Sequence, residues 1–135
     1  MMFKLCPLVF ALAVAAVGQV TNKVDAVIAS GQSLSATVEL KPQGRSGACT
    51  LATIVMPSAW TAANITFQGS VDGQTFGDIY DDSGAEVVVT AAASRVIVVT
   101  ASYFWGIRWI RLRSGTSSAP VNQAAQRTIS LYCRE

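Results

Sequence analysis

Apolar and polar residues alternate along much of the chain from Asp25 onward. In residues 34–41 every second side chain is apolar, beginning with Leu34. Such alternation places one set of side chains in a core and the other set in solvent, as in an antiparallel sheet. The other segments that we expect to form strands are residues 49–56, 64–71, 76–80, 86–90, 95–100, 107–113 and 127–133.

Turn-forming residues separate these segments. The pair Asp72-Gly73 is typical of a β-hairpin, because both central residues of a type I′ turn have positive φ. Further turn sequences occupy residues 82–84 and 114–116. Seven or eight short strands at this spacing predict an all-β fold, an antiparallel β-sandwich with a jelly-roll-like arrangement. After residue 24 we expect at most single helical turns, at residues 91–94 and 122–125.

The N-terminal residues 1–24 have a different pattern. Lys4 precedes an apolar run at residues 5–17, and Ala16-Val17-Gly18 resembles a cleavage site. This is the layout of a secretory signal peptide. The run is short for a membrane span, which needs about 20 apolar residues.

The interpretation that we favour is instead an apolar arm or helix that the mature protein keeps and packs on a neighbouring subunit. We therefore divide the chain into residues 1–24, an apolar N-terminal segment, and residues 25–135, a β-sandwich domain. The arm residues that we expect at a partner interface are Leu8, Phe10 and Leu12.

Composition narrows the function classes. The chain has 135 residues, 51% of them hydrophobic, with no histidine and a net charge of +2. This length fits one domain with a real core. The lack of histidine removes Ser-His-Asp and Cys-His catalytic pairs and the commonest zinc ligand. A small net charge is unlike the basic surface of a nucleic-acid-binding domain. We expect a non-enzymatic protein that needs no cofactor and binds neither nucleic acid nor a membrane.

Three cysteines, Cys6, Cys49 and Cys133, match no zinc or redox motif. Cys49 and Cys133 can form a disulfide if their strands are neighbours. We expect instead that they are buried reduced thiols that pack as small apolar residues.

Five acidic residues lie close together in the sequence. Oxygen-rich loops of this kind can hold calcium, although the spacing differs from that of an EF-hand. Aspartates are also common in ordinary turns, where they bind local backbone amides, and this is the interpretation that we favour. The five are Asp72, Asp78, Asp81, Asp82 and Glu86.

Residues 104–113 combine aromatic and basic side chains. If they form one strand, a single face carries tryptophan and arginine, which are enriched at binding hot spots. An apolar patch of this size rarely stays open to water. The alternative is that both faces lie within the sandwich while the arginine stems reach solvent. The candidate partner interface consists of Trp105, Ile107, Trp109, Arg111 and Arg113.

The segments 87–89 and 96–99 are apolar on both strand faces. A strand with two apolar faces must be covered on both, and one small sandwich covers only one face of each sheet. This pattern predicts a homo-oligomer.

Two blocks of sequence occur together in this chain. The first is residues 56–76, MPSAWTAANITFQGSVDGQTF, and the second is IRLRSGT at residues 110–116, followed by PVNQ at 120–123 and the strand 127–131. As a pair they resemble small β-sandwich virion proteins of tailed bacteriophages. The resemblance implies a capsid decoration or cement subunit, located in the virion, that stabilises the shell through contacts with the major capsid protein or with copies of itself.

Other functions stay open. A tail or collar component of the virion is one alternative, and a secreted or host-recognition carbohydrate-binding module with Trp105 and Trp109 as a stacking platform is another. The element Ser70-x-Asp72-Gly73-x-x-Phe76 also occurs in discoidin-like carbohydrate-binding sandwiches, where it is a structural hairpin. A signal-like N-terminus is unusual for a phage protein, and cleavage of residues 1–18 would make the protein extracellular.

Overall fold

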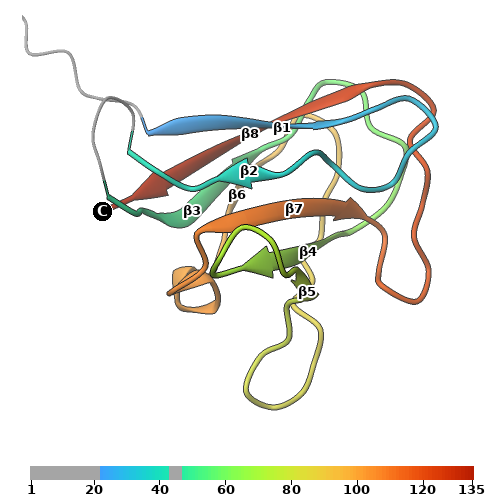
Figure 1. Cartoon of the computed structure of the whole chain (residues 1–135). Helices are drawn as coiled ribbons and strands as arrows, with labels where there is room; N and C mark the ends of the chain where they lie inside the picture. Colours follow the sequence, from blue (N-terminus) through green and yellow to red (C-terminus); the bar gives the residue numbers. More distant parts are fainter. Residues whose placement is uncertain (1–21, 43–46) are drawn as a thin grey trace, which may run out of the picture.

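The alternating segments form two antiparallel four-stranded sheets that pack face to face (Figure 1). The computed structural model describes residues 22–42 and 47–135. Sheet A has the order β1-β8-β3-β6, and sheet B has the order β2-β7-β4-β5. The strands of sheet A are β1 (Lys23–Ile28), β8 (Arg127–Arg134), β3 (Thr50–Val55) and β6 (Val96–Val98). Those of sheet B are β2 (Val38–Glu39), β7 (Trp109–Ser114), β4 (Ile65–Ser70) and β5 (Gly77–Asp78).

Strand pairing follows a simple rule. The first strand pairs with the last, β2 with β7, β3 with β6, and β4 with β5, in each case antiparallel. One long hairpin rolled across two sheets makes this set of pairs, which is compatible with a jelly-roll-like arrangement. The predicted all-β antiparallel sandwich is confirmed.

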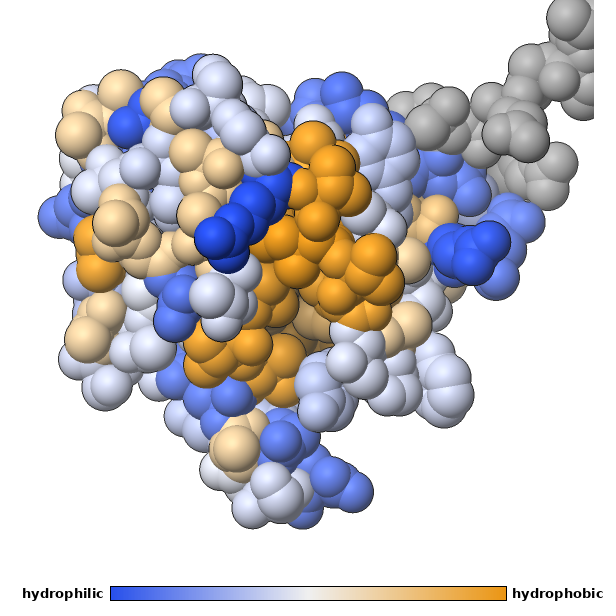
Figure 2. All heavy atoms as spheres, turned by 180° about the vertical axis from the view of Figure 1, so that it is seen from behind, coloured by the Kyte–Doolittle hydropathy of each residue, from blue (hydrophilic) through white to orange (hydrophobic). Residues whose placement is uncertain are grey.

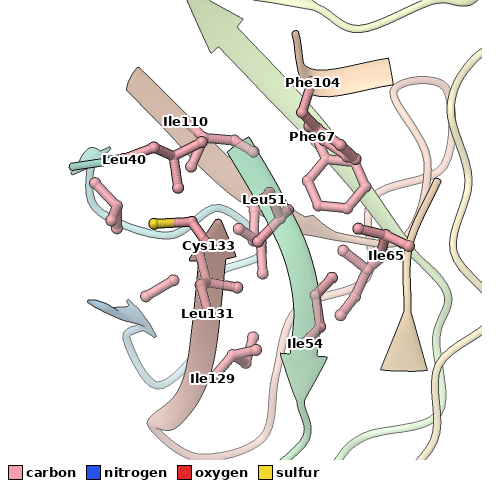
Figure 3. Packing of buried hydrophobic residues seen from close by; sticks show 14 of the residues in the cluster. Leu40, Leu51, Ile54, Ile65, Phe67, Phe104, Ile110, Ile129, Leu131 and Cys133 are labelled. Carbon is pink, nitrogen blue, oxygen red and sulfur yellow. The ribbon is translucent and has the colours of Figure 1, made fainter. Parts of the chain in front are cut away.

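The core lies between the two sheets and comes from the inward half of each alternating pattern. On β8, for example, Ile129 and Leu131 are fully buried, whereas Thr128 is exposed. The aromatic ring of Phe67 on β4 meets that of Phe104 edge-on, with 5.0 Å between their centroids (Figure 3). The other fully buried large apolar residues are Ile28, Leu40, Leu51, Ile54, Ile65, Ile110 and Leu112.

Three segments differ from the strand predictions. Of residues 34–41, only β2 (Val38–Glu39) forms a strand, and Leu34 makes an isolated bridge to Arg113. Strand β1 starts at Lys23, before the expected domain boundary, and had not been expected to form a strand. It forms because it pairs along its whole length with β8. Residues 86–90 form only isolated bridges, Tyr80↔Glu86 and Ile65↔Val89, as the chain crosses from sheet B towards sheet A.

The helical predictions were also wrong. Neither 91–94 nor 122–125 is helical, and the one helix in the described part of the chain is a 3-10 turn, η1 (Ala101–Phe104). Within that part, no helix has the length and apolar character that crossing a membrane requires. Residues 1–21, which include Leu8, Phe10, Leu12 and the cleavage-site sequence at 16–18, lie outside the described residues.

Cys49 and Cys133 form a disulfide, so the expectation of reduced thiols was wrong. Cys49 directly precedes β3, and Leu51 on β3 pairs with Cys133 on β8. This pairing brings the two Cα atoms to 5.5 Å, a separation that a disulfide spans. Both residues are buried, which is the part of the expectation that the structure supports.

We expect the disulfide to stabilise the fold substantially, because the two cysteines are 84 residues apart and the bond restricts a long loop of the unfolded chain. Reduction should lower the free energy of unfolding by about 2–4 kcal/mol. Urea denaturation with and without reductant measures this difference. The Cys49→Ser/Cys133→Ser variant should match the reduced protein and ignore reductant, and a wild-type midpoint that does not respond to reductant would contradict the prediction.

Candidate interaction surface

The predicted interface segment 104–113 is not one continuous strand. Residues 101–104 form η1, Gly106 has a positive φ of 80°, and the Ile107 amide donates a hydrogen bond to the Phe104 carbonyl (3.1 Å). This turn means that β7 begins only at Trp109. The expectation that the interface candidates share one strand face is therefore wrong.

Trp105 and Ile107 lie outside the strand and point to different environments. Trp105 follows η1 and is 71% exposed. Phe104, next to it, is buried in the core, so the tryptophan is presented on an anchored turn. Ile107 packs against the core and contacts the inner side of β4 at Gly69. Of these two candidates, only Trp105 is available to a partner.

Trp109 and Arg111 lie on the outer face of sheet B, where the turn between β4 and β5 covers them in part. The Trp109 ring lies against Gly73, whose φ is +77° and where a Cβ atom would come within 3.0 Å of the ring. The Arg111 guanidinium stacks on Phe76, 3.7 Å from the ring centroid. It also donates a hydrogen bond from Nε to Thr37 Oγ1 (2.8 Å).

Arg113 is buried and is not available to a partner at the surface. It is 8% exposed and forms ion pairs with Asp78 and with Glu86, the latter at 3.5 Å. Its Nη1 atom lies 3.5 Å from Thr66 Oγ1 and donates to it. Arg113 therefore ties β7 to β5 and to the segment after it, and its stem does not extend into solvent.

The five acidic residues separate into different roles. Asp72 and Asp81 hold turns, as expected, and Asp78 and Glu86 pair with Arg113, which the sequence did not indicate. The described residues contain no group of three or more cysteine or acidic side chains that could hold a metal ion. The calcium alternative has no geometric support within that part of the chain.

The turn at residues 71–76 depends on Asp72 and Ser70. One carboxylate oxygen of Asp72 accepts hydrogen bonds from the Thr75 and Gln74 amides (both 2.8 Å), and the Ser70 hydroxyl donates to it as well (2.9 Å). These donors lower the pKa of Asp72 to about 2. Only Gly73 of the Asp72-Gly73 pair has positive φ, so the predicted type I′ turn was wrong although a turn does join β4 and β5.

A second surface, at the β6 end of sheet A, is apolar and open. Val98 is 82% exposed and Val96 is 69% exposed on β6, while Val88 and Tyr103 are partly exposed beside them. Val88, Val98 and Tyr103 line a hollow of about 270 Å³. Figure 2 shows hydrophobic side chains gathered around a hollow on this side of the molecule. We call the four exposed side chains of Val88, Val96, Val98 and Tyr103 the valine edge.

The valine edge was missed as a site, although its signal was present in the sequence. Segments 87–89 and 96–99 are apolar on both strand faces, and this pattern led only to a general expectation of oligomerisation. The structure shows that the inward residues Val87 and Val99 are buried, whereas the alternate ones are exposed. Exposed apolar patches on soluble proteins mark interaction sites.

Replacing Arg113 and Trp105 should separate a structural role from a surface role. Arg113→Met leaves Asp78 and Glu86 without their countercharge and should lower the free energy of unfolding by about 3 kcal/mol, the lower end for a buried pair, because the Asp78 carboxylate is partly exposed. Trp105→Ala should change it by less than about 0.5 kcal/mol, because the side chain is exposed. Urea denaturation of both variants measures this, and equal effects would contradict the assignment.

The low pKa of Asp72 predicts a pH-dependent contribution to stability. The folded value of about 2 is below the usual value of about 3.9, so the carboxylate stabilises the fold above about pH 4. That contribution disappears as the pH falls through about 2. Asp72→Asn should therefore be less stable than wild type at about pH 5, and the difference should shrink towards about pH 2. Denaturation midpoints at both pH values measure it, with the exposed Asp82→Asn as control; a constant difference would overturn the prediction.

The chain matches no protein-family model, no curated protein and no solved structure. The resemblance to virion proteins of tailed bacteriophages therefore stays a prediction based on the two sequence blocks, and the surfaces described above are the independent basis for a functional proposal.

Proposed function

We propose that this protein is a non-enzymatic structural protein that works by binding other protein subunits. The observation that carries the proposal is the valine edge, where Val96 and Val98 are mostly exposed on a folded, disulfide-linked sandwich. Complete burial of a valine side chain is worth roughly 1.5–3 kcal/mol. A subunit that covers this edge therefore gains binding free energy without any rearrangement of the core.

More specifically, we propose that the protein is a capsid decoration or cement subunit of a bacteriophage virion, as the resemblance implies. Such a protein stabilises a shell by mass action, because it binds the assembled shell and not the separated capsid proteins. At a concentration a hundred times its dissociation constant, a ligand of this kind adds about 2.7 kcal/mol per site. No catalytic group is needed for this role. A tail or collar component would use the same surfaces in a different part of the virion.

The disulfide bears on where the protein works. Disulfides persist in oxidising surroundings, which include both secreted proteins and the surfaces of released virions. The Cys49–Cys133 bond therefore supports an extracellular site of action in either case. The mass of the mature chain distinguishes the two: a start at Met1 favours a retained arm, and a start near Gln19 favours secretion.

One observation favours the secreted carbohydrate-binding module as a second candidate. Trp105 is 71% exposed on an anchored turn, which is a suitable position for stacking on a sugar ring. Trp109, its expected partner in a stacking platform, lies against the turn at Gly73. A sugar site would therefore depend mainly on Trp105.

The shell-binding role predicts co-sedimentation. Purified protein should sediment with capsids of its phage and raise the temperature at which they disrupt, because binding favours the assembled form. Val96→Lys, which places a charge on the valine edge, should weaken both effects, whereas Val71→Lys, at a comparably exposed valine elsewhere, should not. Failure to sediment with any virion, together with glycan-array binding that Trp105→Ala abolishes, would replace this role with the carbohydrate-binding module.

A further inference from the structure

Strand β6 is at the edge of sheet A, and among residues 22–42 and 47–135 its backbone pairs with another strand on one side only. The Met56 amide donates to the Arg95 carbonyl (2.8 Å), and the Val99 amide donates to the Ala52 carbonyl (3.0 Å). Hydrogen-bonded and non-hydrogen-bonded pairs alternate along an antiparallel ladder. Ile97, opposite Ile54, is therefore hydrogen-bonded to β3, whereas Val96 and Val98 direct their N–H and C=O groups away from it.

No strand in the described part of the chain pairs with this outer side of β6. Proteins normally protect an open edge by keeping the strand very short, as here, or with lysine, proline, a bulge or a covering loop. Residues 96–100, VIVVT, contain none of the protective residue types. The valine side chains on the outer face are also among the most exposed apolar side chains described. Open backbone groups and exposed apolar side chains thus coincide on one short strand.

We propose that β6 pairs with β6 of a second copy of this chain, antiparallel and across a two-fold axis that passes beside Ile97. In this register Val96 of each copy lies opposite Val98 of the other. The two outward N–H and two outward C=O groups of each strand then all find partners, so that four hydrogen bonds join the copies. The edge is therefore self-complementary, as a two-fold interface requires.

Charge supports a second copy rather than a charged partner. Residues 87–94 and 96–103 carry no ionisable side chain except Tyr103, so that no like charges face each other across the axis. The nearest charged side chain on the strand's own segment is Arg95. In the proposed register it lies opposite Val99 of the other copy, and the two arginines are at opposite ends of the pairing.

Area determines how far the contact must extend. A stable, specific interface buries at least about 1,000 Å² in total, which is more than two three-residue strands provide. The remaining contact must come from the adjacent part of the valine edge, where Val88 and Tyr103 line the hollow next to β6. The pairing sets Val96 and Val98 of one copy beside Val98 and Val96 of the other, as cross-strand apolar pairs on the outer face of one continuous sheet.

This inference deepens the proposed function, since it names the surface and one partner of the proposed subunit role, and it rests on that role for its biological meaning. It is testable without any other virion protein. Analytical ultracentrifugation of the mature chain should show a concentration-dependent dimer. Val98→Lys should raise the dissociation constant by roughly a hundredfold, because it places a charge among apolar side chains at the contact.

Val71→Lys is the matched control, because Val71 is 73% exposed but lies in the turn after β4. It should leave the dissociation constant unchanged. A wild-type chain that stays monomeric at high concentration, or a dimer that Val98→Lys does not weaken, would overturn the inference. Growth into open-ended aggregates would equally contradict a closed two-fold pairing.

Amide hydrogen exchange of the wild-type protein gives a second test that does not depend on a variant. The Ile97 amide, bonded to β3, should exchange slowly at every concentration. The Val96 and Val98 amides should exchange fast in the monomer and at least roughly tenfold more slowly in the dimer, because only pairing with the second copy protects them. Fast exchange of both amides in a confirmed dimer would place the interface elsewhere.

The outcomes separate this inference from the proposed function. A chain that stays monomeric yet sediments with capsids retains the shell-binding role and loses the β6 pairing. A chain that dimerises through β6 but binds no virion retains the pairing and loses the virion role.

Discussion

The structure depends on burying the inward-facing side chains of two small sheets against each other. The longer strands contribute alternate apolar residues to this layer, and Phe67 on β4 meets Phe104 from η1 edge-on within it. Because the first strand pairs with the last, both ends of the sandwich domain lie in sheet A, and the disulfide at Cys133 fastens the end of β8 to the start of β3. The core is thus closed by hydrophobic packing and by one covalent link between distant parts of the chain.

Polar side chains at the margins of this core form hydrogen bonds and ion pairs with one another. Gln123 is fully buried, and its side-chain amide donates to Ser114 Oγ (2.6 Å) and to the Thr61 carbonyl (3.0 Å). Arg113 similarly joins the strands of sheet B through two carboxylates. Among the described residues, no buried side-chain nitrogen or oxygen lacks a hydrogen-bond partner. The outer face of sheet B is thus stabilised in part by the protein's own side chains and turns.

The β6 end of sheet A is organised in the opposite way. There no described strand pairs with the outer side of β6, and two valines are turned outward where a partner could cover them. A short edge strand with these properties gains little stability within one chain but is suited to contact between chains. This contrast between an outer face of sheet B that its own turn partly covers and an exposed apolar edge is the physical basis for the proposal that the protein works as a subunit. The exposed Trp105 is a smaller feature, because it is a single side chain on a turn.

Alternation of apolar and polar residues was sufficient to predict the all-β sandwich and most of its strands, because the period of two is a local property of the sequence. The same pattern indicated that 96–99 needed cover on both faces. The alternating pattern did not indicate the local turn at Gly106, after which β7 begins only at Trp109. Nor could sequence show that Arg113 meets Asp78, because this ion pair joins segments distant in the chain. The Cys49–Cys133 pair has the same origin: only the β3–β8 register brings the two thiols together. Local periodicity thus determined the fold class, and strand pairing decided which side chains became core, ion pair or exposed surface.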